Sequence, residues 1–219
     1  RRNFRLMMHG TMPGLAIAFV LLVVLSGCGD NGPTVLLQDN FDDVRSGWGA
    51  NEQDTFVRGY DEDAEVYFFA IEEPIWFAWA HPGETFTDVR VQVESWRVSR
   101  ADDGHFGVLC RYRNPDNFYY LAISADGYYA IFRNLDGEIT VLSADGDGML
   151  FSSAINTGAE SNQITAACQG DALRLTVNGQ VLATVTDSAL AKGDVGLGVG
   201  SGPTADCEVQ FDDFDVVET

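Results

Sequence analysis

Positively charged side chains are scarce in this sequence of 219 residues. It has one lysine, Lys192, and twelve arginines against 33 aspartates and glutamates, which gives a formal net charge of −20 at pH 7. Proteins that bind nucleic acid concentrate Lys and Arg where the phosphates lie, so this composition argues against a nucleic-acid partner. Hydrophobic residues nevertheless make up 46% of the chain, which is too apolar for a disordered protein. The length suits one domain of ordinary size.

Histidine and cysteine are also rare, with three and four residues. The cysteines form no Cys-x-x-Cys pair, and only His81 and His105 follow the first 30 residues, so the usual zinc ligands are lacking. No Gly-x-Ser-x-Gly turn is present, and two histidines leave little material for a Ser-His-Asp triad. We therefore expect no metal site and no catalytic residues.

No apolar run is long enough to cross a bilayer as a helix. The longest, Gly14–Leu25, has twelve residues, whereas a spanning helix needs ~20. Arginines precede it at positions 1, 2 and 5, and this combination is typical of a secretory signal peptide. The run ends in Leu25-Ser26-Gly27-Cys28, which resembles the bacterial lipobox. The resemblance implies cleavage before Cys28 and attachment of diacylglycerol to its thiol.

These features predict three segments: a lipoprotein signal peptide helix at 1–27, a tether at 28–35, and a folded domain at 36–218. An ordinary secretory leader or a single membrane anchor with a chance cysteine is the alternative. The lipid would hold the protein at the extracytoplasmic face of the cell membrane, since acyl chains contribute ~0.8 kcal/mol per buried methylene. Loss of residues 1–27 leaves ten cations and 33 acidic residues, so anionic headgroups should repel the domain itself.

Beyond residue 35 the sequence has the pattern of β-strands. Turn signals recur about every ten residues, as in an all-β sandwich. The pairs Asp126-Gly127, Asp136-Gly137 and Asn178-Gly179 each separate two β-rich runs, which predicts three hairpins. The only helical feature is one turn at Ser188–Lys192. The predicted strands are Glu65–Ile71, Ile75–Ala80, Val89–Val98, Phe106–Arg113, Phe118–Ser124, Tyr128–Arg133, Glu138–Leu142, Ala172–Val177, Gln180–Val185, Val195–Val199 and Glu208–Val217.

Alternation along the strands predicts which side chains face the core. Val91 and Val93 share one side of their strand. In the last strand, Phe211 and Phe214 are separated by one residue too many for simple alternation. We therefore predict a β-bulge at Asp212-Asp213 that returns Phe214 to the core side.

Segments spread over Leu36–Glu218 carry a family resemblance. They are Gln38–Asp43 with Ser46–Trp48, Phe106–Arg113, Asp116–Tyr120, Asp126–Tyr129, Gly193–Leu197 and Phe211–Phe214. These segments are similar to the concanavalin A-like (laminin-G-like) jelly-roll domains of bacterial surface lipoproteins, lectins, glucanases and keto-disaccharide hydrolases. The resemblance implies an all-β sandwich of two antiparallel sheets. It does not single out a function, because the fold hosts lectins, glycosidases, keto-sugar hydrolases, sensor ectodomains and adhesion modules.

The same resemblance implies a disulfide. In those domains a cysteine in the Arg-Tyr strand tends to accompany one at the position of Cys168, which pairs Cys110 with Cys168. Closing a loop of about sixty residues would stabilise the fold by about 4 kcal/mol on the chain-entropy model. Cys207 would be left unpaired, and three buried free thiols are the alternative.

Acidic residues near the C-terminus come close to a catalytic motif. Glycosidases of this fold carry paired carboxylates on one strand, in the pattern Glu-x-Asp-x-x-Glu, at the separation that retention of configuration needs. The segment Asp213–Glu218 departs from this pattern because it begins with Asp and lies in the last predicted strand. We interpret it as the polar face of that strand and expect the protein not to be an enzyme.

Acidic clusters also raise the question of calcium. Asp39–Asp43 and Asp212–Asp215 lie in the first and last strand regions, which often pair in jelly rolls, and Asp145–Gly148 is similar to the start of a calcium loop. A chain of this net charge produces such clusters by composition alone. We expect no cofactor, with a structural calcium ion as the less favoured alternative.

Aromatic side chains give the best case for a ligand. Trp76 and Trp79 lie in one predicted strand, and Tyr119 lies in another. The flat C–H faces of sugar rings stack on aromatic rings, and ligand clefts are largely apolar with a few placed polar groups. We therefore take these three residues as candidate ligand contacts. The alternative is that their rings fill the sandwich core.

Two arginines complete the candidate ligand-binding set. If Cys110 faces the core, alternation turns Arg111 and Arg113 to the outer face of the same strand. A guanidinium group suits vicinal hydroxyls or the carboxylates of an anionic glycan, which the acidic body would otherwise repel. The alternative is that both arginines lie on a solvated face, paired with carboxylates.

Together these observations predict a membrane-anchored extracytoplasmic lipoprotein with a non-catalytic module that binds carbohydrate or another envelope component. Two other readings stay open. One is a glycoside or keto-sugar hydrolase of the same fold, and the other is a structural or interaction lipoprotein without a small ligand.

Overall fold

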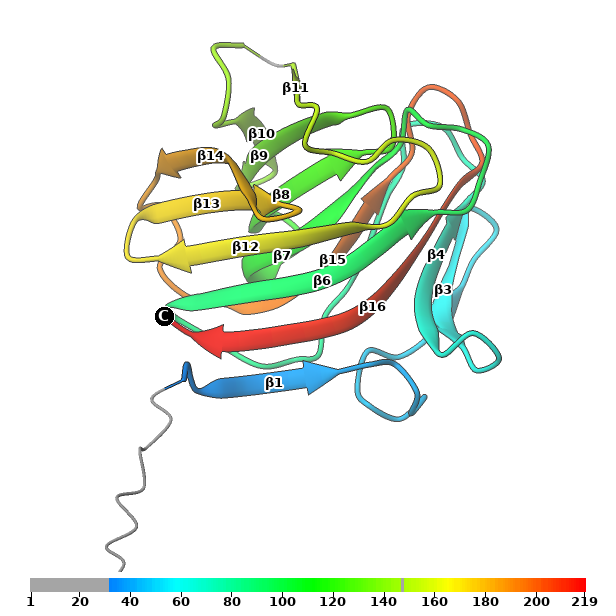
Figure 1. The fold of residues 1–219 in the computed structure, drawn as a ribbon, viewed down its shortest axis with the longest axis horizontal. Helices are drawn as coiled ribbons and strands as arrows, with labels where there is room; N and C mark the ends of the chain where they lie inside the picture. Colours follow the sequence, from blue (N-terminus) through cyan, green and yellow to red (C-terminus); the bar gives the residue numbers. More distant parts are fainter. Residues whose placement is uncertain (1–31, 147) are drawn as a thin grey trace, which may run out of the picture. The chain divides into compact units, whose positions relative to one another are not determined.

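A computed structural model describes residues 32–146 and 148–219, which form an all-β structure (Figure 1). The fold class predicted from the sequence is confirmed. The predicted signal peptide helix and Cys28 lie outside the described residues. The helical turn predicted at Ser188–Lys192 is wrong, because this segment is irregular and connects two strands. Within the described ranges we find no helix with the length and apolarity that crossing a membrane requires.

The described residues form sixteen strands. They are β1 (Val35–Asp39), β2 (Asn51–Glu52), β3 (Phe56–Asp61), β4 (Val66–Ile71), β5 (Phe77–Ala80), β6 (Val89–Arg97), β7 (His105–Asn114), β8 (Asn117–Ser124), β9 (Tyr128–Leu135), β10 (Glu138–Val141), β11 (Leu150–Phe151), β12 (Asn162–Gln169), β13 (Ala172–Val177), β14 (Gln180–Thr186), β15 (Asp194–Gly200) and β16 (Cys207–Glu218).

The strands form two antiparallel sheets, layered one behind the other in Figure 1. The nine-stranded sheet has the order β14-β13-β12-β6-β16-β4-β3-β2, and β1 pairs with β16. The seven-stranded sheet has the order β10-β9-β8-β7-β15-β5, and β11 pairs with β9. In each sheet, half of the hydrogen-bonded pairs join strands that are consecutive in the sequence, and the other half join strands that are distant in the sequence.

The three predicted hairpins are confirmed. Asp126-Gly127 joins β8 to β9, Asp136-Gly137 joins β9 to β10, and Asn178-Gly179 joins β13 to β14. In the last two turns both central residues have positive φ, from 50° to 83°. That is the backbone of a type I′ turn, which matches the twist of paired strands and favours Asn-Gly and Asp-Gly sequences.

The inner faces of the two sheets form one hydrophobic core. Val91 and Val93 are fully buried in it, as alternation predicts. The predicted bulge in β16 is also confirmed, because the register of β16 with β6 shifts between Asp212 and Asp215. Phe211 and Phe214 are consequently both buried on the core side.

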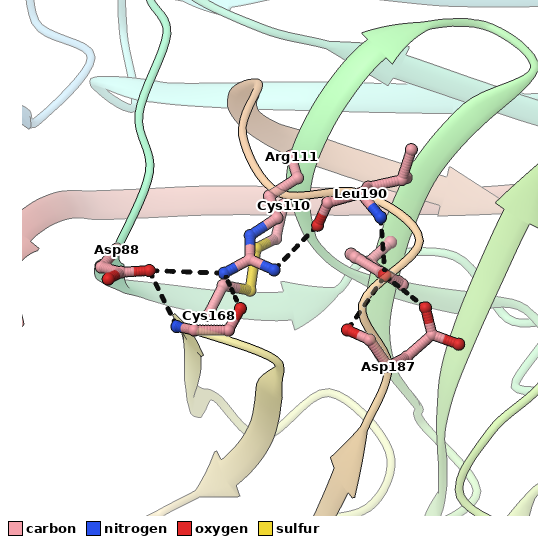
Figure 2. Close-up of a disulfide and its surroundings, with 8 residues drawn as sticks. Asp88, Cys110, Arg111, Cys168, Asp187 and Leu190 are labelled. Carbon is pink, nitrogen blue, oxygen red and sulfur yellow. Dashed lines mark hydrogen bonds and ion pairs between the residues drawn. A yellow bond between two sulfur atoms is a disulfide. The ribbon is translucent and has the colours of Figure 1, made fainter.

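A disulfide joins the two sheets (Figure 2). Cys110 of β7 and Cys168 of β12 are bonded, with their Cα atoms 6.8 Å apart and a sequence separation of 58. The predicted pairing is therefore confirmed. Cys207 is free and buried, and burial raises the pKa of its thiol to about 12. Such a thiol is protonated at neutral pH and is a poor nucleophile.

Candidate ligand-binding site

The seven-stranded sheet has a cluster of apolar side chains on its outer face as well as on its inner face, although no other layer covers the outer face in the described part of the chain. Along β5 and β8, side chains that point into the core alternate with aromatic side chains that point outward. The outward side chains form a second hydrophobic cluster, separate from the core. Its members are Phe77, Trp79, Leu109, Tyr112, Phe118, Tyr120, Ala122 and Phe132.

Glycines open the middle of this outer face. In β15 the valines and leucine point into the core, so Gly196, Gly198 and Gly200 occupy the outward positions. A Cβ atom on Gly198 would lie 2.9 Å from the rings of both Phe77 and Tyr120. The rings of Phe77 and Tyr120 therefore lie over a part of β15, from Gly196 to Gly200, that has no outward side chains. Glycine at alternate positions of a predicted strand indicates close approach of neighbouring groups, and this signal in Val195–Val199 could have pointed to the outer face.

The outer face contains a hollow of about 240 Å³, which we call the aromatic hollow. The exposed side chains of Ile75, Trp76 and Ile139 form its rim, and the less exposed lining residues form its floor: Phe77, His105, Phe118, Tyr120, Phe132, Asn134 and Ser201. Phe77 stacks on Phe118 with a centroid distance of 5.9 Å and an interplanar angle of 11°. None of these lining residues carries a carboxyl group or a permanent positive charge.

The rim at Ile75 and Trp76 is exposed but held in place. Ile75 is 80% exposed and has a φ of 56°, a left-handed conformation that β-branched residues rarely adopt. Its N–H donates to the Gly202 carbonyl, while the N–H of Trp76 donates to Ser201 Oγ at 2.9 Å. Ser201 Oγ in turn donates to the Glu73 carbonyl at 2.6 Å. Strained backbone held by such bonds is typical of binding sites.

His105 and Tyr120 bring polar atoms to the floor. The Tyr120 hydroxyl lies 3.1 Å from His105 Nδ1 and donates to the Gly198 carbonyl at 3.1 Å. Burial lowers the pKa of His105 to about 4 and raises the pKa of Tyr120 well above its usual range. Both groups are therefore neutral at physiological pH.

A second, polar hollow lies on the same sheet, at the end where β7 finishes and β15 begins. It has a volume of about 400 Å³ and is lined by His81, Gly83, Glu84, Thr85, Tyr112, Arg113, Lys192, Gly193 and Asp194. Asp194 Oδ2 accepts hydrogen bonds from His81 Nδ1 at 2.8 Å and from the Gly83 N–H at 2.7 Å. The Trp79 indole N–H donates to the Tyr112 hydroxyl at 3.1 Å, which connects this hollow to the aromatic cluster.

Arg111 is not on the outer face, so the orientation predicted for it is wrong. Its φ is 54°, and the register of β7 with β8 shifts between Cys110 and Asn114. This bulge reverses the alternation, so that Arg111 is 2% exposed on the core side. Its guanidinium donates to the Leu190 carbonyl at 2.8 Å and to the Gly170 carbonyl at 2.7 Å, beside the disulfide (Figure 2).

The other predicted ligand residues are divided between the core and the outer face. Tyr119 is fully buried in the core, where its hydroxyl bonds Asp187, so its predicted role as a surface contact is wrong. Arg113 is exposed at the polar hollow, where its Nε donates to the Lys192 carbonyl at 3.2 Å. Trp76 lies on the rim of the aromatic hollow, and Trp79 stacks on Phe77 with a centroid distance of 6.0 Å.

The acidic residues singled out in the sequence lie elsewhere. Asp213 and Asp215 line a shallow depression beside β1, on the nine-stranded sheet, where Asp215 accepts a hydrogen bond from Gln38. The Asp39 carboxylate accepts hydrogen bonds from the Phe41 N–H and the Trp48 indole N–H, each at 2.8 Å. Within residues 32–146 and 148–219, no three His, Cys, Asp or Glu side chains are grouped to hold a metal ion.

Comparison with protein-family models and with curated proteins gives no match. Among solved structures, the chain is similar to carbohydrate-binding module CBM66 from Bacillus subtilis, with 12% identity and a TM-score of 0.56 over 68% of this chain and 86% of that one. A protein of unknown function with a galectin-like fold, also from Bacillus subtilis, gives 12% identity and a TM-score of 0.64 over 85% and 97%. The β-glucanase of Bacillus licheniformis has 9% sequence identity and a TM-score of 0.61, and the match covers 86% of this chain and 100% of that one. At this identity the likeness establishes the fold, a concanavalin A-like jelly roll, as the sequence predicted.

Proposed function

We propose that the protein is a membrane-anchored extracytoplasmic lipoprotein whose domain is a non-catalytic carbohydrate-binding module. The ligand site in this proposal is the aromatic hollow. The observation that carries the proposal is that the outer face of the seven-stranded sheet gathers aromatic rings around a hollow, instead of the polar side chains expected of a solvated sheet face. CBM66 and the β-glucanase have the same fold, which supports this choice of ligand class.

The chemistry of the hollow suits a sugar ring. A pyranose has apolar C–H faces that stack on aromatic rings and polar edges that need a few hydrogen-bonding groups. Phe77 and Phe118 offer parallel ring planes, and Trp76, at 41% exposure, offers a ring at the rim. The rings of Phe77 and Tyr120 lie against Gly198 of β15, so the positions of these two rings are fixed before a ligand arrives.

Binding without hydrolysis is the form of the proposal that the lining residues support. Glycoside hydrolysis needs two carboxyl groups flanking the scissile bond, about 5 to 9.5 Å apart. The residues that line the aromatic hollow include no Asp or Glu. Asp194, in the polar hollow, already accepts hydrogen bonds from His81, Gly83 and the Val195 N–H.

A glycan-binding assay tests the ligand site. The full chain should bind a panel of immobilised glycans, and free sugar should compete. Trp76→Ala should weaken binding by about 1–2 kcal/mol, because it removes an aromatic ring at the rim. Trp96→Ala is the matched control, since Trp96 lies in β6 of the nine-stranded sheet. Equal affinities of the two variants, or no glycan bound at all, would contradict the proposal.

A fractionation assay tests the anchor. Cys28→Ser should release the protein from membranes, because Cys28 is the thiol at the lipobox position and one lipidated residue carries the attachment. Cys207→Ser, which changes a cysteine within the domain, should stay in the membrane fraction. If the Cys28→Ser protein still sediments with membranes and resists high salt, the lipoprotein assignment is wrong.

A further inference from the structure

Asn134, a residue that lines the aromatic hollow, has a buried hydrogen-bond acceptor without a partner. Asn134 of β9 is 8% exposed, and its Nδ2 donates to the Pro115 carbonyl at 3.0 Å. That bond fixes the orientation of the amide, so Oδ1 is its other end. Oδ1 is buried and accepts no hydrogen bond from any described residue. Buried polar atoms are nearly always paired, so an unpaired one on the wall of a hollow points to a ligand donor.

A second acceptor follows from the hydrogen bonds of His105. The Tyr120 hydroxyl has one hydrogen, and it donates that hydrogen to the Gly198 carbonyl. The 3.1 Å contact with His105 Nδ1 therefore requires the hydrogen to be on Nδ1. A neutral imidazole has only one N–H, which leaves Nε2 as an acceptor. Asn134 Oδ1 and His105 Nε2 are therefore two acceptors among the lining residues. The Tyr120 hydroxyl cannot donate to a ligand, because its hydrogen is bonded to the Gly198 carbonyl.

The rim supplies the complementary group. The indole N–H of Trp76 can only donate, and it has no partner among the described residues, whereas the indoles of Trp48, Trp79 and Trp96 are each hydrogen-bonded. Trp76 is also 41% exposed, so its N–H is open to a ligand. The hollow therefore combines acceptors at the floor, a donor at the rim, and aromatic rings between them.

This arrangement distinguishes between classes of sugar. A hydroxyl that donates to Asn134 would bring its own lone pairs against the rings of Phe118 and Phe132, where they would lack a donor. An amide N–H has no lone pair to satisfy. A carboxylate is unsuitable as well, because no cationic side chain lines the hollow.

We propose that the aromatic hollow recognises the acetamido group of an N-acetylated amino sugar. The N–H of that group donates to Asn134 Oδ1 or His105 Nε2, its carbonyl accepts from Trp76 Nε1, and its methyl group contacts the phenylalanine rings. The hollow, at about 240 Å³, suits one such group with part of its sugar ring. This inference rests on the proposed function, because it names the ligand class of the same site.

The test compares sugars that differ at one substituent. N-acetylglucosamine, N-acetylgalactosamine, glucosamine, glucose and galactose are each displayed on the same polymer, and binding of the full chain is measured with free sugar as competitor. We expect one of the N-acetylated sugars to bind about tenfold or more tightly than the sugars of the same configuration in the panel that lack the acetyl group. Equal binding of acetylated and plain sugars would overturn the inference and leave the proposed function standing. If no displayed sugar binds, the proposed function fails and the inference fails with it.

Two variants connect the preference to the named atoms. Asn134→Leu keeps the branched shape of the side chain but removes the acceptor, together with the donor to the Pro115 carbonyl, so the acetamido preference should fall to about twofold or less. Trp76→Phe keeps an aromatic ring at the rim and removes the indole N–H, and it should reduce the preference without changing the melting temperature. Because Trp76 is exposed, this second variant remains informative if Asn134→Leu does not fold. An unchanged preference in both variants would place recognition elsewhere.

Discussion

The outer faces of the two sheets differ although their inner faces are alike. In β6 of the nine-stranded sheet, buried residues alternate with partly or fully exposed polar ones, among them Arg90, Gln92 and Glu94. In β8 of the seven-stranded sheet, every residue after Asn117 is buried, on both faces. The first pattern is that of an antiparallel sheet with one face in water. The second, with no layer above it in the described residues, marks the face on which we place the ligand.

Removal of the disulfide that joins the two sheets should have the largest effect on stability. Cys110→Ala and Cys168→Ala should each lower the free energy of unfolding by about 4 kcal/mol, since each removes the same cross-link of 58 residues. The double variant should be little worse than either single one. Urea denaturation of the three variants measures this. Additive losses would show that the two cysteines stabilise the fold separately.

The next largest expected effect on stability is at Arg111, and it should differ clearly from the effect at Arg113, two residues further along β7. Arg111→Ala removes a buried guanidinium and leaves the Leu190 and Gly170 carbonyls without their donor, so we expect a loss of about 3 kcal/mol in the free energy of unfolding. Arg113→Ala, on the exposed side of the bulge, should cost less than about 0.5 kcal/mol. The two variants are compared by denaturant unfolding. Similar losses would mean that the bulge does not divide the two residues.

Adding one methyl group to the outer face should make it less able to bind. The Cβ of Gly198→Ala would lie 2.9 Å from the Phe77 and Tyr120 rings, which must move to admit it. We expect about 2 kcal/mol lower stability and weaker glycan binding. Gly148→Ala is the control, because nothing lies within 4 Å of the Cβ atom that it adds. Unchanged binding by Gly198→Ala would indicate that the rings do not form the site.

The smallest expected effect is a loss of folding stability at acidic pH. The pKa of folded His105 is about 4, below the ordinary value of 6.5, because burial disfavours the charged form. Between these two pH values the unfolded chain binds a proton that the folded chain does not, so stability falls as the pH drops from 6.5 to 4. After discounting for partial exposure, we expect His105 to contribute about 1 kcal/mol of this loss.

Replacing the imidazole isolates that contribution from the titration of carboxylates. His105→Phe should unfold with a shallower pH dependence over the same range, measured as the difference between the melting temperatures at pH 7 and pH 4. The wild type and the variant share every carboxylate, so only the imidazole separates them. Identical pH dependence would show that His105 titrates normally in the folded protein.

Much of the fold could be predicted because its signals are local. Asp-Gly and Asn-Gly pairs fix type I′ hairpins through residues that tolerate positive φ, and the spacing of Phe211 and Phe214 reveals a bulge because both rings must reach the core. These features need no knowledge of distant residues.

The bulge at Arg111 could not be predicted in this way. Arginine rarely adopts the left-handed conformation, so nothing at that position announces it. Its cause lies about eighty residues further on, where a Cβ atom on Gly193 would lie 2.5 Å from the Arg111 carbonyl carbon. Gly193 comes this close only when β15 is in place beside β7. The inward positions of Arg111 and Tyr119 both depend on such distant contacts, with Leu190 and Asp187.

The position of β16 in the nine-stranded sheet has a consequence for folding. β16 comes after every strand that it joins, and it pairs with β1, β4 and β6. Before it is made, the strands β2–β4 have no hydrogen-bonded connection to β6 and β12–β14, and β1 has no partner in its sheet. The hairpins can form as the chain is synthesised, but this sheet can assemble only when the last of the sixteen strands arrives. We expect assembly of this sheet to be slow and to follow the synthesis of β16, because pairing of β1 with β16 closes a loop that contains all the other strands.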